Sequence, residues 1–129
     1  MFEIVKEKIR LWVSKRTPWF FENSKVPVWL SKVAPIEIGA VNILCFVFSR
    51  GEISKTSRRH ETIHYQQQVE MLFLFHWILY SLYFVKGLIV YRSGEKAYRE
   101  NPFEREAYDN QKKHKYLDRR PLWNWTSYR

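Results

Sequence analysis

The stretch RRHETIHYQQQVEM, from Arg58 to Met71, decides how the rest of the sequence is interpreted. In an α-helix, residues four apart are offset by about 40° around the axis. His60 and His64 therefore project from the same face, one turn apart, and two imidazoles so placed can reach one metal ion. Glu61 lies beside that face, where its carboxylate can bond a metal-bound water rather than the ion.

The surroundings of this H-E-x-x-H pattern favour a metal site over a solvated helix face whose histidines bond to neighbours. The motif begins a long segment without proline, directly after the loop RGEISKTS, and that loop follows the apolar, strand-like run Ile43–Phe48. Three hydroxyl residues can cap the start of the helix, because a side-chain oxygen accepts from its free N–H groups: Ser54, Thr56 and Ser57.

With these residues the sequence resembles the zincin metallopeptidases, and more narrowly the gluzincins, whose third zinc ligand is a glutamate on a later helix. The metzincin pattern requires a glycine at position 67 and a histidine at position 70, where this chain has Gln67 and Glu70. The resemblance implies a sheet edge beside the zinc, where a substrate backbone pairs with a strand. The run Ile43–Phe48 is the expected strand.

The stretch NPFEREAYDNQ, residues 101–111, is the expected source of the third ligand. It resembles the E-x-x-A-D helix of integral-membrane gluzincins, with Glu104 followed by an alanine three residues later. The aspartate of that pattern is Tyr108 here, and Asp109 comes one residue later. The resemblance favours Glu104 as the ligand, and Glu106 remains the competing candidate.

Several further polar residues are candidates for supporting roles. Gln67 and Gln68, one turn beyond His64, can hydrogen-bond to the ligands. His76 is too far along the chain to share the ion and is expected to be a hydrogen-bonded core or interface histidine. For the oxyanion, the sequence does not choose among three residues: Tyr65, Tyr108 and His114.

The apolar segment of residues 71–91 has two interpretations. Its 21 residues are about the length that spans a bilayer. Lys86 near its end can snorkel, and Tyr91 and Arg92 suit a headgroup region. A central core helix is also apolar all round, but a chain this short has few elements to surround one. Membrane association would place the zinc at or just above the membrane surface.

The charge of the chain points to anionic partners. With 22 basic and 13 acidic residues the net charge is +9, which suits an anionic membrane. Nucleic acid is unlikely, because no recognised binding motif accompanies the charge. Cys45 is the only cysteine, which excludes an intrachain disulfide and a cysteine-based zinc site. The oligomeric state is not predicted.

The first sixteen residues predict an amphipathic helix. Phe2, Val5, Ile9 and Trp12 recur at helical spacing, so the helix either docks on the core or lies on a membrane. The segment lacks the apolar core of a secretory signal. No signal peptide is therefore expected, and the protein is placed at the cytoplasmic face, membrane-associated or with a single span.

Between the first helix and the motif, prolines interrupt the chain and short strands are expected. VPVWL, residues 26–30, is predicted as an edge strand. Residues 36–48 are predicted as a hairpin or a pair of strands with a turn or bulge at Gly39. After the apolar segment a polar helix restarts, with Asn101 as N-cap and Pro102 at its first position.

The sequence therefore predicts an α+β, minimal zincin-like fold in one domain, residues 1–129. Its elements are an N-terminal helix, two or three short strands, the long H-E-x-x-H helix continuing into the apolar helix, and a helix bearing glutamates. We expect a zinc-dependent metallopeptidase, with Zn²⁺ on His60, His64 and Glu104, Glu61 as the base, and a peptide or protein substrate at or near a membrane.

Two other functions remain open. The first is a metal-binding membrane protein without hydrolytic activity. The second is a basic adaptor that binds lipid or nucleic acid without a metal. The sequence motifs also resemble those of small bacterial, membrane-associated proteins of the metallopeptidase-like kind.

Overall fold

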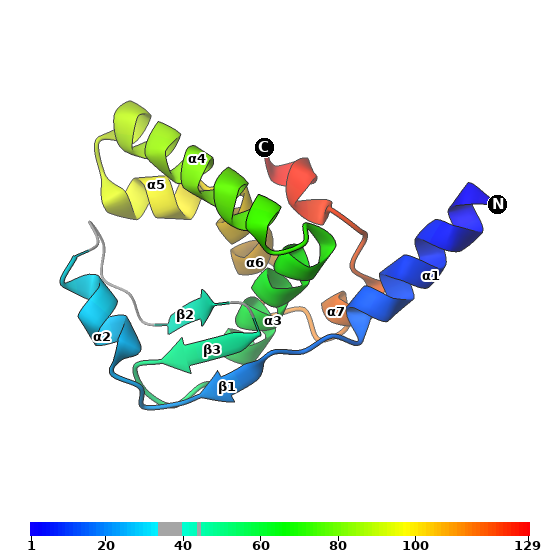
Figure 1. The fold of residues 1–129 in the computed structure, drawn as a ribbon, viewed down its shortest axis with the longest axis horizontal. Coiled ribbons are helices and arrows are strands. Elements are labelled where there is room, and N and C mark those ends of the chain that lie inside the picture. The colour runs from blue at the N-terminus through cyan, green and yellow to red at the C-terminus, as the bar shows by residue number, and fades with distance from the viewer. Residues whose placement is uncertain (34–39, 44) are drawn as a thin grey trace.

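The computed structural model describes residues 1–33, 40–43 and 45–129, and it is mostly helical with one small sheet, compatible with the α+β class (Figure 1). The elements follow in this order: α1 (Phe2–Ser14), β1 (Trp19–Phe21), α2 (Val26–Ser31), β2 (Ala40–Ile43), β3 (Phe46–Ser49), α3 (Lys55–Glu70), α4 (Leu74–Tyr91), α5 (Gly94–Glu100), α6 (Pro102–Asn110), α7 (Tyr116–Arg119) and a short 3-10 helix, η1 (Asn124–Tyr128).

The sheet has three strands in the order β1-β3-β2. The central strand β3 runs parallel to β1, with Trp19 opposite Phe46, and antiparallel to β2, with Asn42 opposite Val47. The antiparallel β2–β3 pair confirms the predicted pair of strands. The prediction of one strand over residues 43–48 is wrong, because β2 ends at Ile43 and β3 begins at Phe46. The predicted turn at Gly39 lies outside the described residues.

VPVWL is helical, and the edge strand predicted there is wrong. Pro27 lies in the first turn of α2, where a helix needs no N–H from the residue and the fixed φ of proline is already helical. Ser24 Oγ accepts a hydrogen bond from the Val26 N–H at 3.2 Å. Ser31 Oγ donates to the Pro27 carbonyl at 2.8 Å. The proline and these local hydrogen bonds thus outweigh the β-rich composition of the stretch.

Helix α3 begins as the sequence predicts. Ser54 is the N-cap, and its Oγ accepts from the Ser57 N–H at 3.1 Å. Most of the helix beyond its first turn is buried, including the whole H-E-x-x-H motif and the glutamines Gln66, Gln67 and Gln68. Because so much of its length is buried, α3 is a central helix of the fold and not a solvated surface helix.

The predicted continuation of α3 into the apolar helix is wrong, because a tight turn separates them. Leu72 and Phe73 both have positive φ, 55° and 60°. The Leu74 N–H bonds to the Leu72 carbonyl at 2.6 Å, which closes a γ-turn centred on Phe73. The turn lets α4 fold back, so that Trp77 Nε1 donates to Gln68 Oε1 at 3.2 Å.

Helices α4, α5 and α6 pack closely. Gly87 of α4 lies so near α5 that a Cβ at this position would be 2.8 Å from Ala97 Cα. Asn101 caps α6, as predicted, with its Oδ1 accepting from the Phe103 N–H at 3.1 Å. Its Nδ2 donates to the Tyr80 carbonyl at 3.1 Å. The short α5–α6 segment is therefore held against the inner face of α4.

Helices α1 and α4 are only partly covered and expose many apolar side chains. Helix α1 extends away from the rest of the molecule (Figure 1), and Val13 in its last turn is its buried residue. Of the 18 residues of α4, His76 and Gly87 are buried. Helix α4 is long and apolar enough to cross a membrane, and it is not the surrounded core helix of the alternative interpretation.

Candidate metal centre

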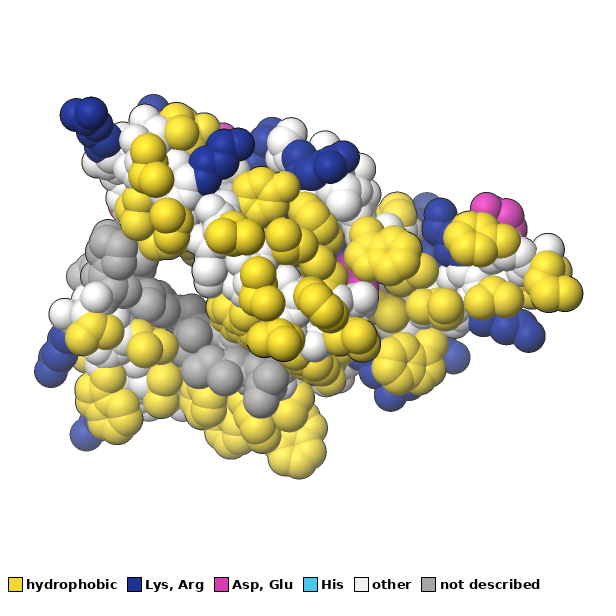
Figure 2. All heavy atoms as spheres, turned by 45° about the horizontal axis from the view of Figure 1, so that its top comes forward, with side chains coloured by type: hydrophobic (Ala, Val, Ile, Leu, Met, Phe, Trp, Pro, Cys, Tyr) yellow, Lys and Arg dark blue, Asp and Glu magenta, His cyan; other side chains and the backbone are white. Residues whose placement is uncertain are grey.

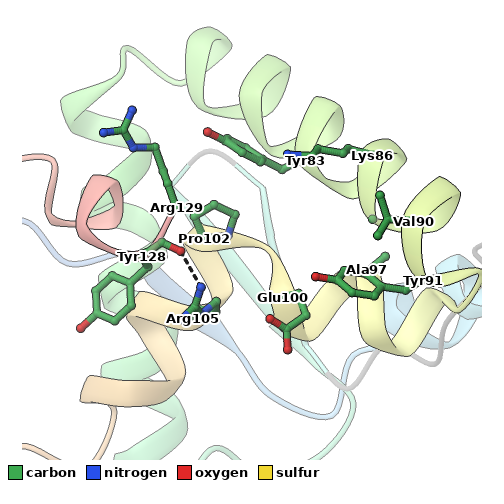
Figure 3. Close-up of a pocket in the computed structure, with 11 residues that line it drawn as sticks. Tyr83, Lys86, Val90, Tyr91, Ala97, Glu100, Pro102, Arg105, Tyr128 and Arg129 are labelled. Atoms are coloured by element: carbon green, nitrogen blue, oxygen red, sulfur yellow. Dashed lines mark hydrogen bonds between the residues drawn. The ribbon is translucent and has the colours of Figure 1, made fainter.

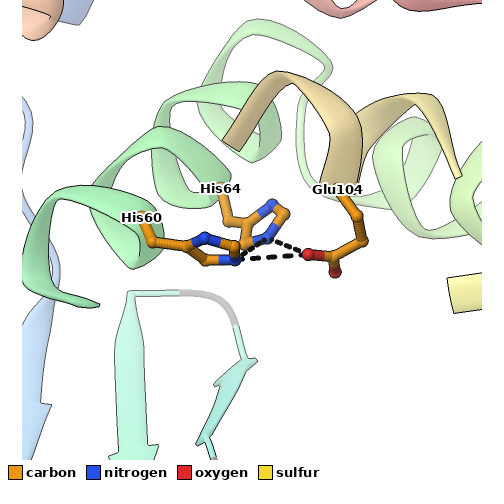
Figure 4. Close-up of side chains that lie close together, drawn as sticks. All are labelled: His60, His64 and Glu104. Atoms are coloured by element: carbon orange, nitrogen blue, oxygen red, sulfur yellow. Dashed lines mark hydrogen bonds and ion pairs between the residues drawn. The ribbon is translucent and has the colours of Figure 1, made fainter. Parts of the chain in front are cut away.

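Three side chains from two helices meet at one point (Figure 4). Glu104 Oε1 lies 3.2 Å from His60 Nε2 and 2.9 Å from His64 Nε2. The two Nε2 atoms are 3.1 Å apart. These three buried residues can hold a metal ion.

The spacing of the three atoms suits a small tetrahedral ion. With bonds of 2.0–2.1 Å and tetrahedral angles, two nitrogen or oxygen ligands of zinc are about 3.3 Å apart. All three separations here are within a few tenths of an ångström of that value. Two histidines and one glutamate are also a donor set of catalytic zinc sites, which keep a further position for water.

Local structure explains this placement. His60 and His64 are one turn apart on α3, and Glu104 lies in the first turn of α6. The cap at Asn101 and the proline that follows fix where α6 starts, and so fix the direction of the Glu104 side chain. The exposed fractions of these three ligand residues are 6, 6 and 4%.

Each histidine is oriented by a glutamine. His60 Nδ1 lies 2.8 Å from Gln111 Oε1, and His64 Nδ1 lies 2.9 Å from Gln67 Oε1. An amide oxygen can only accept, so the Nδ1 atoms carry the protons and donate. The Nε2 atoms are then free to bind a metal, which is the tautomer that outer hydrogen bonds impose in metal sites.

The orienting glutamines are themselves fixed. Gln67 Nε2 donates to the Phe103 carbonyl and to Glu106 Oε1, both at 3.0 Å, so its oxygen must face His64. Gln111 is held through its backbone, because Arg59 Nη1 donates to its carbonyl at 2.6 Å. Sequence reasoning missed Gln111, although it lies two helical turns after Glu104.

Glu106, the competing ligand candidate, belongs to a second buried cluster. Its carboxylate accepts from Arg120 Nε at 2.6 Å and from Tyr116 OH at 2.7 Å. Arg120 also pairs with Glu70 at 2.6 Å. Burial lowers the pKa of Arg120, but Glu106 and Glu70 outweigh burial and raise it. Through Gln67, this cluster supports the metal ligands without belonging to them.

Tyrosines complete the surroundings of the site. Tyr80 OH donates to Glu104 Oε2 at 2.7 Å, a contact that no sequence pattern indicated. The Tyr108 ring packs edge-on against His60 with centroids 4.5 Å apart. Of the other oxyanion candidates, Tyr65 packs against Phe73 and His114 is exposed.

Glu61 is buried beside the ligands. Burial raises the pKa of its carboxyl, while His64 and His60 act to lower it. Asn42 of β2 donates to the Glu61 carbonyl at 2.8 Å, and its Oδ1 accepts from Gln68 at 2.7 Å. Strand β2 is therefore tied directly to the motif, and among the described strands it pairs with β3 alone.

The charges of the ligands are complementary in the absence of an ion. Burial acts to lower the pKa of His64, but the Glu104 carboxylate outweighs it and raises the pKa to about 9. Burial acts to raise the pKa of Glu104, but His64 and His60 reverse this and lower it. A protonated His64 thus supplies positive charge that balances the Glu104 carboxylate.

Two other features contribute no ligand to this centre. His76 is buried against Phe103, and within the described part of the chain neither ring nitrogen has a hydrogen-bond partner. The prediction that it is hydrogen-bonded is therefore wrong.

A cavity of about 180 Å³ between α4, α5 and the C-terminal residues is lined by side chains such as Lys86 and Arg105 and by none of the three ligands (Figure 3).

Comparisons of the chain with protein-family models, with curated proteins and with solved structures find no match. No relative therefore supplies a function. Function has to be inferred from the chemistry of the site and from the surface around it.

Proposed function

We propose that the protein is a zinc-dependent metallopeptidase that hydrolyses peptide bonds at or near a membrane surface. One observation carries this proposal. His60 Nε2, His64 Nε2 and Glu104 Oε1 converge within 3.2 Å of one another, and both histidines are held in the metal-binding tautomer. The H-E-x-x-H pattern adds a carboxylate next to the ligands.

Each residue has a distinct part in the proposed reaction. His60, His64 and Glu104 hold the ion, and Tyr80 fixes the second oxygen of Glu104. When bound, zinc polarises a carbonyl and lowers the pKa of a water. Glu61 accepts a proton from the attacking water and delivers it to the leaving amine, so that one water is consumed for each peptide bond broken.

A peptide is favoured as substrate by the strand beside the motif. Strand β2 is at the edge of the sheet and is linked to α3 through Asn42. An extended peptide can pair with such an edge through its backbone. Because β3 is central and paired on both sides, β2 and not the predicted run Ile43–Phe48 offers this edge.

The test measures zinc content and peptide hydrolysis in parallel. Purified protein should carry one zinc per chain, and His60→Ala should lose it, whereas His114→Ala, at an exposed histidine, should retain it. Glu61→Gln should keep zinc but lower kcat/KM by about 100- to 10,000-fold, because a base and not a ligand is removed. Full activity in Glu61→Gln, or wild-type protein that takes up no zinc, would refute the proposal.

A further inference from the structure

The outer face of α4 carries an apolar stripe that no other described element covers. Its residues recur every three or four positions and are 46–72% exposed: Leu74, Ile78, Leu82, Val85 and Ile89. Soluble monomers rarely expose a contiguous apolar patch of more than a few hundred Å². An exposed stripe of this kind is typical of an interaction surface.

Helix α1 presents a second exposed apolar stripe. Phe2, Val5, Ile9 and Trp12 are 48–76% exposed. Figure 2 shows apolar side chains gathered over α4 and continuing along α1, with Lys and Arg side chains around them. We call these two stripes together the apolar face.

We propose that the apolar face docks on an anionic lipid bilayer, with α4 lying in the interface and not spanning it. This inference deepens the membrane location in the proposed function and rests on it, but it does not require the metal chemistry.

Charge complementarity selects an anionic bilayer as the occupant. From Met71 to Arg92 there is no acidic residue, and the charged residues are Lys86 and Arg92. Just beyond the end of α1, Arg16 lies over the Trp12 ring at 4.2 Å, which places a cation beside an exposed aromatic residue of the face. Basic residues beside apolar and aromatic ones are typical of helices that bind anionic membranes in the interfacial plane.

The inner face of α4 is incompatible with a transmembrane orientation. Tyr80 donates to Glu104, and Asn101 donates to the Tyr80 carbonyl. Gly87 is in close contact with Ala97. A spanning helix would carry these contacts, and the buried Glu104 carboxylate, into the hydrocarbon.

This orientation narrows the class of substrate. Tyr80 on the inner side of α4 touches the metal ligand Glu104, while Ile78 and Leu82 point outward. The candidate metal centre then lies about one helix diameter, some 10 Å, from the lipid. Peptide segments that emerge from the bilayer, or are tethered to it, are the substrates that reach such a site.

The first experiment measures co-sedimentation of the purified full chain with phosphatidylcholine vesicles, with or without phosphatidylglycerol. Wild type should bind the anionic vesicles, and added salt should weaken binding. Leu82→Glu should weaken it about tenfold or more, because a buried leucine is worth about 1.5–3 kcal/mol. Val33→Glu, at an 83% exposed apolar residue outside the apolar face, should bind as wild type does.

The second experiment decides the orientation. In a Cys45→Ser background, single cysteines at Leu72→Cys and Glu95→Cys mark the two ends of α4. On vesicles, a membrane-impermeant maleimide should label both ends from the same side. Labelling of only one end until detergent is added would mean a spanning helix and would overturn the proposal.

Other results separate this inference from the metallopeptidase proposal. Glu61→Gln should bind vesicles as wild type does, and Leu82→Glu should keep its zinc. Zinc uptake without vesicle binding would overturn the docking proposal alone, and vesicle binding without zinc would overturn the enzyme alone. A dimer in lipid-free solution that Leu82→Glu dissociates, without vesicle binding, would make a second copy of the chain the occupant.

Discussion

Three consecutive buried glutamines of α3 each form hydrogen bonds to other parts of the fold. Gln66 reaches the end of α1, with Nε2 3.4 Å from the Ser14 carbonyl. Gln67 joins His64 to Glu106, and Gln68 joins Asn42 to Trp77. Gln67 and Gln68 each donate and accept, and so link two groups in a core where unpaired polar atoms are costly, whereas Gln66 only donates.

Gln67→Ala should weaken zinc binding by about 10- to 100-fold, because it removes the acceptor that orients His64. The matched control is Gln66→Ala, which removes an equally buried glutamine whose described hydrogen bonds are to α1 and to the residues that follow it. Competition with a chromophoric chelator measures both affinities. Equal affinities in the two variants would show that Gln67 does not position the ligand.

The metal-free protein should become less stable as the pH rises from 6.5 to 9. His64 has its ordinary pKa of 6.5 in the unfolded chain and a pKa of about 9 in the folded one. Its pairing with Glu104 therefore contributes fully below pH 6.5 and is lost as the pH rises through 9. Urea unfolding with a chelator present measures the change. Glu104→Gln should reduce this dependence, and a wild-type stability that does not fall would contradict it.

Part of the arrangement of the site residues could be predicted from the sequence. The spacing of His60 and His64 places both imidazoles on one helix face whatever the fold. Glu104 was indicated by the resemblance to the gluzincins and not by spacing, since 40 residues separate it from His64. Gln111 and Tyr80 were missed because their roles depend on how α3, α4 and α6 pack, which local periodicity does not encode.

At the scale of elements, the contact of α4 with α5 depends on the glycine of α4. Gly87→Ala should lower the free energy of unfolding by about 1–3 kcal/mol, because its new Cβ would be 2.8 Å from Ala97 Cα. This loss outweighs the gain in helix propensity of about 1 kcal/mol. Gly51→Ala is the control, since a Cβ there meets nothing within 4 Å. Denaturant unfolding of both variants decides whether this contact is tight.

The elements with clear local signals were predicted, and those decided by tertiary contacts were not. Ser54 and Asn101 mark helix starts because their side chains satisfy free N–H groups within two or three residues. No proline or glycine marks the break between α3 and α4 at Leu72 and Phe73. Its positive φ values are sustained by the folding of α4 against α6, which a local pattern cannot show.

At the scale of the whole molecule, the interior is unusually polar. Among the described residues the buried polar and charged side chains number 15, against 7 buried hydrophobic ones. Much of the apolar content lies outside, on α1 and α4. A small apolar core contributes little free energy of folding, so the hydrogen-bonded centre around α3 and α6 has a large share in holding the fold.

A metal at this centre should therefore stabilise the entire fold. Ligands from α3 and α6 are shared by one ion, which binds the folded chain far better than the unfolded one. At zinc concentrations about 1,000-fold above Kd, the gain is about 4 kcal/mol, enough to raise Tm by about 10 °C. Calorimetry with zinc and then with excess chelator measures this shift. Glu104→Ala should lose most of it, whereas His114→Ala should keep it in full. An equal shift in Glu104→Ala would show that zinc acts elsewhere on the chain, and no shift in wild type would mean that the three ligands do not hold zinc.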